Sequence, residues 1–400
     1  MLVTITASLL WGAAATWTAV NRTSAANDMV ADTGPLSFYA QQIYQSLADA
    51  DATAAAGFLA VTEPPAARAD FRADIERAVS YLRAVTAADS TPAARSGLMT
   101  LDTGIPEYTM LIGQAQADSR DGLPVGASYL LEASYLMRSR ILPAAEGLYR
   151  QENARLASSY AQATGFPVIA VITAVIGAVA LFGVQRWLTS RTQRVLNRGL
   201  VAASLAGVLS LAWLLGGFLA ARTSLIAARE DGVAAQYLVR AEITVLRAHA
   251  DESLTLINRS GDDASEADFK QAEKQLGPGT GTLLSAARAA AAGRPGYGRA
   301  TAAESAATAW YAVHRAVRGL DNGGGYPDAV HLAIGSGAVR FQHVEADLAG
   351  GIRAGRASFT ASASRGDDAL GGLAAGMGIA SLLMAAGSAW GLTRRIAEYR

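Results

Sequence analysis

The strongest constraint on this 400-residue chain is that four long stretches carry no Asp, Glu, Lys, Arg or His: residues 1–20, 166–185, 200–220 and 369–392. A helix needs about 20 consecutive apolar residues to cross the hydrocarbon core of a bilayer. We therefore predict an integral membrane protein with four transmembrane helices. Two alternatives stay open for the first stretch, a cleaved signal peptide and a gene start that omits a cytoplasmic leader. The fourth, rich in alanine and glycine, could instead be a buried helix of a soluble protein.

Two short segments beside these stretches, residues 186–199 and 393–400, are strongly basic. They hold seven of the 34 basic residues and one of the 34 acidic ones, so the two long regions between spans keep 27 basic and 33 acidic residues. Because short basic segments stay in the cytoplasm, we predict a cytoplasmic turn and a cytoplasmic tail. Their arginines are expected mainly to fix topology and contact anionic lipid, with docking of a cytoplasmic partner as an additional role. These residues are Arg186, Arg191, Arg194, Arg198, Arg394 and Arg395.

The two long regions, residues 21–165 and 221–368, are then extracytoplasmic, and they resemble each other at an offset of 200 residues. "RTS" occurs at residues 22–24 and again at 222–224, and "ADAD" at residues 48–51 is matched by "AHAD" at residues 248–251. Matched span positions and matched lengths point the same way, so we predict an internal tandem duplication.

Both long regions show helical periodicity. Apolar or small residues recur near helical spacing from Leu36 to Phe58 and again from Ile243 to Ile257. Proline and glycine interrupt the first region near residues 63–65, 90–92 and 121–124, and the second near 277–279, 293–296 and 321–327. We therefore predict an all-α protein in which each region is a four-helix bundle. The first and last helices of each bundle should run directly into spans, and Pro143 should kink the last helix of the first bundle.

Residue usage argues against most kinds of chemistry. The chain has no cysteine and four histidines without metal-binding spacing, and it lacks a phosphate-binding GxxxxGK[ST] segment. We expect no enzyme activity, no cofactor, no metal site and, with a net charge of zero, no nucleic-acid partner. Uncharged spans also argue against a pump or channel.

Small residues at GxxxG-like spacing occur in two spans. Gly372 and Gly376 lie in the fourth, and Ala212 and Gly216 lie in the third. Such pairs allow helices to approach closely, so these four residues are candidate span-packing positions. Chance occurrence in alanine-rich spans is the alternative, and a homo-oligomer stays open.

In this predicted topology the extracytoplasmic regions are large and the cytoplasmic segments are short. Such a protein is typical of a sensor whose output passes to a separate protein. We expect the outer bundles to dock a liganded partner and bias the arrangement of the spans. Two alternatives are direct sensing of a small molecule by the bundles, and a role as accessory or assembly subunit of an amino-acid transporter.

Several segments resemble an actinobacterial membrane protein family, the GlnX type. They are "SLADADATAAAGFL" (46–59), "GIPEYTMLIGQAQADSRDGLPVGASYLLEASYLM" (104–137), "ILPAAEGLY" (141–149), "WYAVHRAVRGLDNGGGYPDAV" (310–330) and "AIGSG" (333–337). The resemblance implies a role in amino-acid sensing at the cell membrane. It implies two partners, an extracytoplasmic solute-binding protein of the glutamate- or glutamine-binding GlnH type and a cytoplasmic serine/threonine kinase of the PknG type.

Overall fold

A computed structural model describes residues 2–60, 65–88, 91–192, 198–258 and 264–397. All regular structure in these ranges is helical and no strand occurs in them, as the periodicity predicted. The described chain divides into two compact units. The first comprises Met1–Asp32, Ala157–Ala228 and Thr360–Arg400, and the second comprises Thr33–Leu156 and Arg229–Phe359.

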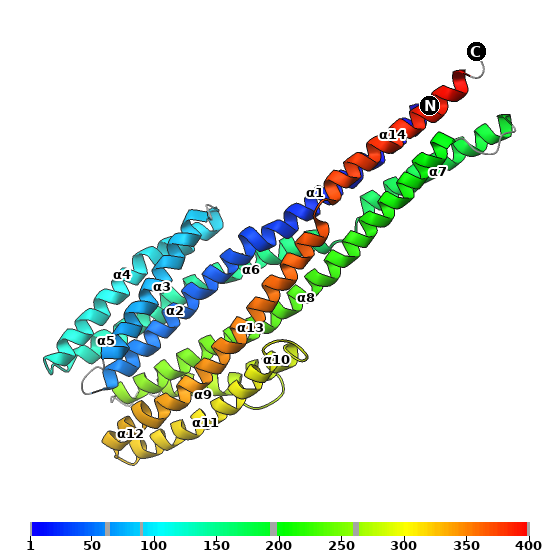
Figure 1. The fold of residues 1–400 in the computed structure, drawn as a ribbon. Helices are drawn as coiled ribbons and strands as arrows, with labels where there is room; N and C mark the ends of the chain where they lie inside the picture. Colours follow the sequence, from blue (N-terminus) through cyan, green and yellow to red (C-terminus); the bar gives the residue numbers. More distant parts are fainter. Residues whose placement is uncertain (1, 61–64, 89–90, 193–197, 259–263, 398–400) are drawn as a thin grey trace. The chain divides into compact units, whose positions relative to one another are not determined.

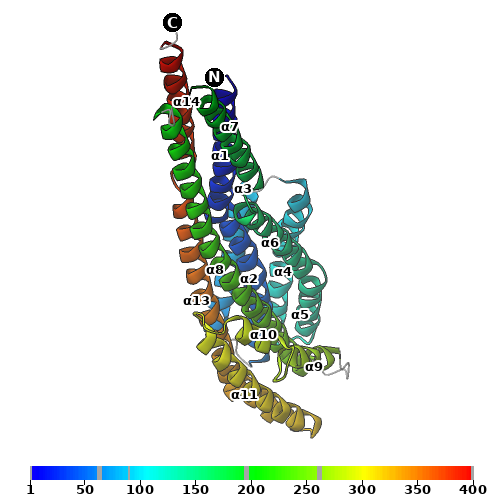
Figure 2. The same cartoon turned by 90° about the vertical axis from the view of Figure 1, so that its right-hand side faces the viewer.

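The first unit is built from long apolar helices (Figure 1). The start of α1, the end of α14 and the two facing ends of α7 and α8 lie at the same end of this unit (Figures 1 and 2). The described helix ends that flank the predicted basic turn and lead to the predicted basic tail are therefore at one end of the unit, whereas residues 193–197 and 398–400 lie outside the described ranges. Its elements are α1 (Leu2–Asp28), α7 (Val168–Thr192), α14 (Leu373–Ala397), the first part of α8 (Arg198–Ile257) and the last parts of α6 (Leu142–Thr164) and α13 (Ala338–Leu370).

Three helical stretches in the described ranges are long and apolar enough to cross a membrane. They lie within Val125–Arg186, Val201–Ile257 and Tyr326–Gly391, and thus contain the second, third and fourth predicted spans. The first predicted span, in α1, is not among the three. Large apolar side chains such as Leu10, Phe182 and Leu209 nevertheless cover the outside of the first unit, which a soluble surface of this extent rarely does.

The second unit contains two sets of helices with similar order. The first set is α2 (Gly34–Leu59), α3 (Pro65–Ala88), α4 (Pro92–Arg120), α5 (Val125–Leu136), the π-helix η2 (Met137–Ile141) and the start of α6. The second set is the end of α8, α9 (Ala264–Leu276), α10 (Leu283–Ala290), α11 (Tyr297–Asn322), α12 (Tyr326–Leu332), η3 (Ala333–Gly337) and α13. Helix ends agree with the proline and glycine breaks expected from the sequence, where those breaks are described.

One hydrophobic core serves both sets of helices. Ile43 and Leu47 of α2 are fully buried in the same cluster as Leu246 of α8 and Val344 of α13. Both sets carry an apolar face, and burying the two faces against each other removes more apolar surface from water than packing each set alone. The two predicted bundles are therefore parts of one compact unit.

The junctions between predicted spans and outer helices differ from the prediction. The first helix of each set does continue into a span: α1 passes through the π-helix η1 (Met29–Thr33) into α2, and α8 is a single helix of 60 residues. The last helices do not. α6 and α7 are separated at Gly165–Pro167, where proline lacks an N–H donor, and α13 and α14 are separated by a turn in which Gly372 has φ +75°.

Pro143 is the second residue of α6 and follows the π-helix η2. A π-helical turn contains one extra residue, and such turns accommodate interruptions of the α-helical hydrogen-bond ladder. The irregularity predicted at Pro143 is thus a π-helical segment just before the proline.

Candidate functional site

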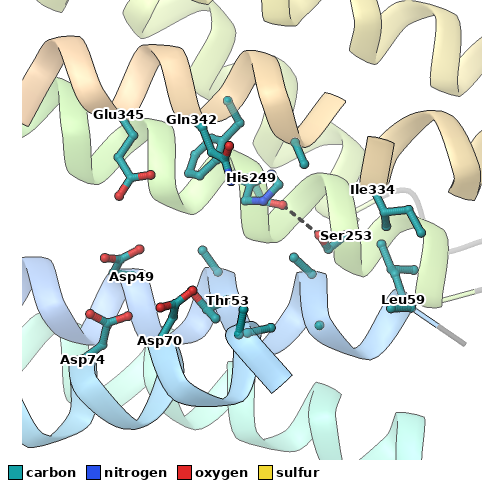
Figure 3. A pocket seen from close by; sticks show the side chains of 18 of the residues that line it. Asp49, Thr53, Leu59, Asp70, Asp74, His249, Ser253, Ile334, Gln342 and Glu345 are labelled. Carbon is teal, nitrogen blue, oxygen red and sulfur yellow. Dashed lines mark hydrogen bonds between the residues drawn. The ribbon is translucent and has the colours of Figure 1, made fainter. Parts of the chain in front are cut away.

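The second unit contains a cavity of about 550 Å³ at the junction of its two sets of helices. α2 and α3 line it from the first set, and α8, η3 and α13 line it from the second set (Figure 3). This volume is within the range of pockets that hold small organic ligands.

The lining of this cavity is polarised. Asp49, Asp74 and Glu345 lie together at one end, close to the exposed Asp70, whereas Leu59 and Ile334 lie at the other end (Figure 3). Arg77 of α3 is the single arginine among the described lining residues, and its Nη1 lies 2.7 Å from Oδ1 of Asp74. Within the described ranges, five carboxyl groups and one guanidinium group therefore line the cavity.

Burial shifts the pKa of the acids at this end upward. Burial raises the pKa of Asp49 to about 6, although Arg77 opposes the shift. Burial and the nearby Asp49 raise the pKa of Asp74 to about 7, and burial, helped by Asp49, does the same for Glu345, also to about 7. The acids destabilise one another when all are ionised because they share a partly dehydrated space.

Glu242 of α8 is close enough to Asp49 and Glu345 for their charges to act on its carboxyl group. It is 1% exposed, and neither carboxylate oxygen has a hydrogen-bond partner among the described residues. Burial raises its pKa well above the usual value, and the charges of Glu345 and Asp49 raise it further. Glu242 is seven residues before His249, on the same face of α8, so its carboxylate belongs to the same acidic group.

His249 lines the cavity and stacks on Phe341, with ring centroids 3.9 Å apart. The side chain is 8% exposed, and its Nδ1 makes no hydrogen bond to a described residue; the nearest carboxylate oxygen, Oε2 of Glu252, is 3.5 Å away. A buried ring nitrogen without a hydrogen bond is a costly feature that a bound molecule can relieve.

Arg138 joins the two sets of helices beside the cavity. Its Nε lies 3.5 Å from Oδ2 of Asp51, and its Nη1 donates to Oδ1 of Asp251. Asp51 also accepts hydrogen bonds from Ser134 at 2.7 Å and from Tyr108 at 3.4 Å. Burial raises the pKa of Asp251 to about 6, against the opposing effect of Arg138.

The two corresponding segments of the predicted repeat, residues 48–51 and 248–251, lie close together in the second unit. Asp51 and Asp251 are 200 residues apart and share Arg138, and Asp49 and His249, also 200 residues apart, both line the cavity. "ADAD" and "AHAD" therefore face each other across the junction.

In the remaining buried histidine, His314, both ring nitrogens have hydrogen-bond partners. Its Nδ1 lies 2.9 Å from Glu252 and its Nε2 lies 3.3 Å from Glu266. Burial opposes the charged form of His314, but these carboxylates raise its pKa. Burial likewise opposes ionisation of Glu252, but the nearby His249 and His314 lower its pKa to about 2. This network stabilises the core of the second set.

The predicted arginines lie at the ends of the first unit's helices. Arg186 is exposed in α7. Arg191, Arg198, Arg394 and Arg395 lie in helices, but their side chains are outside the described part of the structure, as is the whole of Arg194.

The four predicted packing positions occupy different surroundings. A Cβ atom on Gly376 would collide with the Trp213 ring, so α14 and α8 approach closely there. Gly372 lies in the turn before α14, where its positive φ explains the glycine, rather than in a helix contact. Ala212 and Gly216 are exposed on α8. Gly12, which the sequence analysis did not select, lies against Ser381 of α14.

Asp49, Glu242 and Glu345 were not among the residues predicted from the sequence. Asp49 is two residues after Leu47 and six after Ile43, which places it off their apolar helix face, so periodicity carried no signal for it. One signal was available for Glu242, which immediately precedes the apolar stripe that begins at Ile243 and is four residues before Leu246. Acidic residues inside a predicted apolar face indicate either a buried ion pair or a polar cavity.

Comparison with known proteins gives one match, and no curated protein and no solved structure matches the chain. Residues 25–161, from the end of α1 through most of α6, match the family described as the actinobacterial sensor domain. This match supports a sensor protein of the kind found in actinobacteria.

Proposed function

We propose that this protein is a membrane signal relay, which couples an extracytoplasmic amino-acid signal to a cytoplasmic serine/threonine kinase. The match to a sensor domain and the three apolar helices support a sensor in a membrane. We propose that α1 is a fourth span, because α1 is uncharged over residues 2–20 and packs against α14 and α7. The chain then crosses the cell membrane four times.

The observation that carries the proposal is the continuity of α8. One helix of 60 residues contributes its first part to the apolar unit and its last part, including His249 and Glu252, to the cavity of the second unit. A shift of such a helix at one end is transmitted along its length, because the backbone hydrogen bonds keep it rigid.

The partners follow from the resemblance to GlnX-type proteins. We propose a GlnH-type solute-binding protein on the outer side and a PknG-type kinase at the basic turn and tail. No catalytic step, cofactor or nucleic-acid contact is part of this proposal, and the exposed Ala212 and Gly216 offer a contact for a second copy.

The test uses the full chain in lipid nanodiscs. We expect it to bind a purified GlnH-type protein in the presence of glutamate or glutamine more tightly than without it, measured by surface plasmon resonance. Substituting Arg186, Arg191, Arg394 and Arg395 by Gln should weaken binding of the PknG-type kinase. A matched variant with four exposed arginines of the second unit changed to Gln, at positions 68, 72, 83 and 95, should retain it. Absence of binding of the solute-binding protein under every condition contradicts the relay.

Direct sensing of a small molecule is the second candidate. The cavity of about 550 Å³ between the two sets of helices favours it, because a ligand there contacts both α2 and α8. Its acidic lining opposes direct binding of glutamate, which is consistent with a separate protein carrying that signal.

A further inference from the structure

Several carboxyl groups in and beside the cavity lack a hydrogen-bond or ion-pair partner among the described residues. Asp49 and Glu345 are partly buried, face the space from opposite sets of helices and make no hydrogen bond or ion pair to another described residue (Figure 3). Glu242 adds a completely buried carboxylate with two unbonded oxygens next to them. Buried carboxylates without partners are costly, so this arrangement calls for a positively charged, hydrogen-bond-donating occupant.

We infer that the cavity binds a small organic cation, whose ammonium group lies between Asp49 and Glu345 and whose carbon chain extends toward Leu59 and Ile334. An ammonium group has three donors and so can satisfy carboxylates from both sets of helices at once. The inference rests on the second candidate of the proposed function, direct sensing, and names the ligand class for it.

Two other ligand classes fit the cavity less well. In the described part of the chain, no group of three or more histidine or acidic side chains is placed to hold a metal ion. An anionic amino acid would add negative charge to five carboxyl groups. Of the described lining residues, only Arg77, already paired to Asp74, could receive its extra carboxylate.

Ligand binding also has a structural consequence. When ionised, Asp49 and Asp74 of the first set repel Glu345 and Glu242 of the second set. A cation between them replaces repulsion by attraction, and so favours a closer arrangement of α2 and α3 against α8 and α13. Since α8 continues into the apolar unit, this is a physical route by which a ligand changes the spans.

The test measures binding to the full chain in nanodiscs by isothermal titration calorimetry and thermal unfolding. The probes are 1,5-diaminopentane, L-lysine, which is the same chain with a carboxylate, and L-glutamate. We expect 1,5-diaminopentane to bind and to raise the unfolding temperature, L-lysine to bind more weakly, and L-glutamate not to bind. Absence of binding by both amines, or equal binding of glutamate, overturns the inference.

Two variants separate binding from folding. Glu345→Gln and Asp49→Asn each remove one charge, so each should raise the unfolding temperature of the ligand-free protein while weakening 1,5-diaminopentane binding about 10- to 100-fold, as expected for a lost charge-assisted hydrogen bond. Glu132→Gln removes the same charge from an exposed position of α5 and should change neither. Unchanged diamine affinity in both cavity variants overturns the assignment.

Failure of the cation-binding inference and failure of the relay proposal give different experimental results. Failure of the amines with intact, glutamate-dependent capture of the GlnH-type protein overturns this inference alone. Amine binding without capture contradicts the relay through a binding protein and leaves direct sensing in place.

Discussion

At the scale of single residues, Arg138 is the most consequential contact in the second unit. Its guanidinium joins Asp51 and Asp251, both of which are almost completely buried, while 25% of the arginine side chain is exposed. The two acids are 200 residues apart, at matching positions of the predicted repeat. One cation thus neutralises two like charges, one from α2 and one from α8.

Replacing Arg138 by Ala should therefore destabilise the second unit strongly. Removing one member of a buried ion pair leaves uncompensated charge, with a cost of about 3 kcal/mol after allowance for the partial exposure of the arginine. The measurement is urea unfolding of the full chain in nanodiscs, followed by circular dichroism.

Arg140→Ala is the matched control for this substitution. Arg140 is two residues away, and its ion pair with Glu107, at 3.4 Å, is about half exposed on both sides. Its loss should cost roughly 0–1 kcal/mol. Equal destabilisation by the two substitutions would show that Arg138 does not hold the two sets of helices together.

At the scale of elements, the four junctions between outer helices and predicted spans are of two kinds. α1–η1–α2 and α8 pass through without a break, whereas Gly165–Pro167 and Gly371–Gly372 interrupt the other two. The breaks occur at corresponding places in the two sets, before α7 and before α14. Each set thus has one uninterrupted helical connection to the apolar helices and one connection interrupted by proline or glycine.

Breaking α8 should uncouple the units without removing the ligand site. Thr223→Pro removes the N–H that binds the carbonyl of residue 219 and costs about 3 kcal/mol of helix stability. Thr223 is exposed, and its hydroxyl bonds only to the carbonyl of Ala220 of its own helix, so Thr223→Ala is the matched control.

The readout is the distance between spin labels at Arg186→Cys and Thr393→Cys, which are exposed positions in a chain without natural cysteine. Adding 1,5-diaminopentane or a GlnH-type protein with its amino acid should change this distance by about 1–5 Å in the Thr223→Ala protein. The change should disappear in Thr223→Pro. A full response in the proline variant excludes α8 as the connection.

At the scale of the whole molecule, the described residues that line the cavity of the second unit include more acids than arginines. The pKa of Asp49 is raised to about 6, and those of Asp74 and Glu345 are raised to about 7. These carboxyls retain protons in the folded protein at pH values where they have lost them in the unfolded chain. Folding stability from this group is therefore present below about pH 4 and falls as pH rises toward 7.

We expect the unfolding temperature of the ligand-free protein to decrease from pH 5 to pH 8. His314 acts in the same direction, because its raised pKa adds stability that is lost as pH rises, whereas the lowered pKa of Glu252 matters only in stronger acid. The measurement is differential scanning fluorimetry in nanodiscs at one-unit pH steps. The charged and titratable groups around the cavity are Asp49, Asp70, Asp74, Arg77, Glu242, His249, Glu252 and Glu345.

Asp74→Asn and Glu345→Gln should each flatten this pH profile, and Glu132→Gln should leave it unchanged. An unfolding temperature that rises from pH 5 to pH 8 would be incompatible with the raised pKa values and with unpaired acids in the cavity.

The sequence alone determined the helices, most of their ends, and three of the apolar stretches that can cross a membrane. These properties depend on local features: the absence of charge over about 20 residues, helical periodicity, and the backbone restrictions of proline and glycine. It also marked "ADAD" and "AHAD" as corresponding segments. Tertiary structure decided that the two long regions between the predicted spans share one core, that Arg138 joins Asp51 to Asp251, and that Asp49 and Glu345 face one cavity. Periodicity shows which face of a helix is buried but not which distant helix covers it, and the pKa and partners of a carboxyl group depend on those distant neighbours.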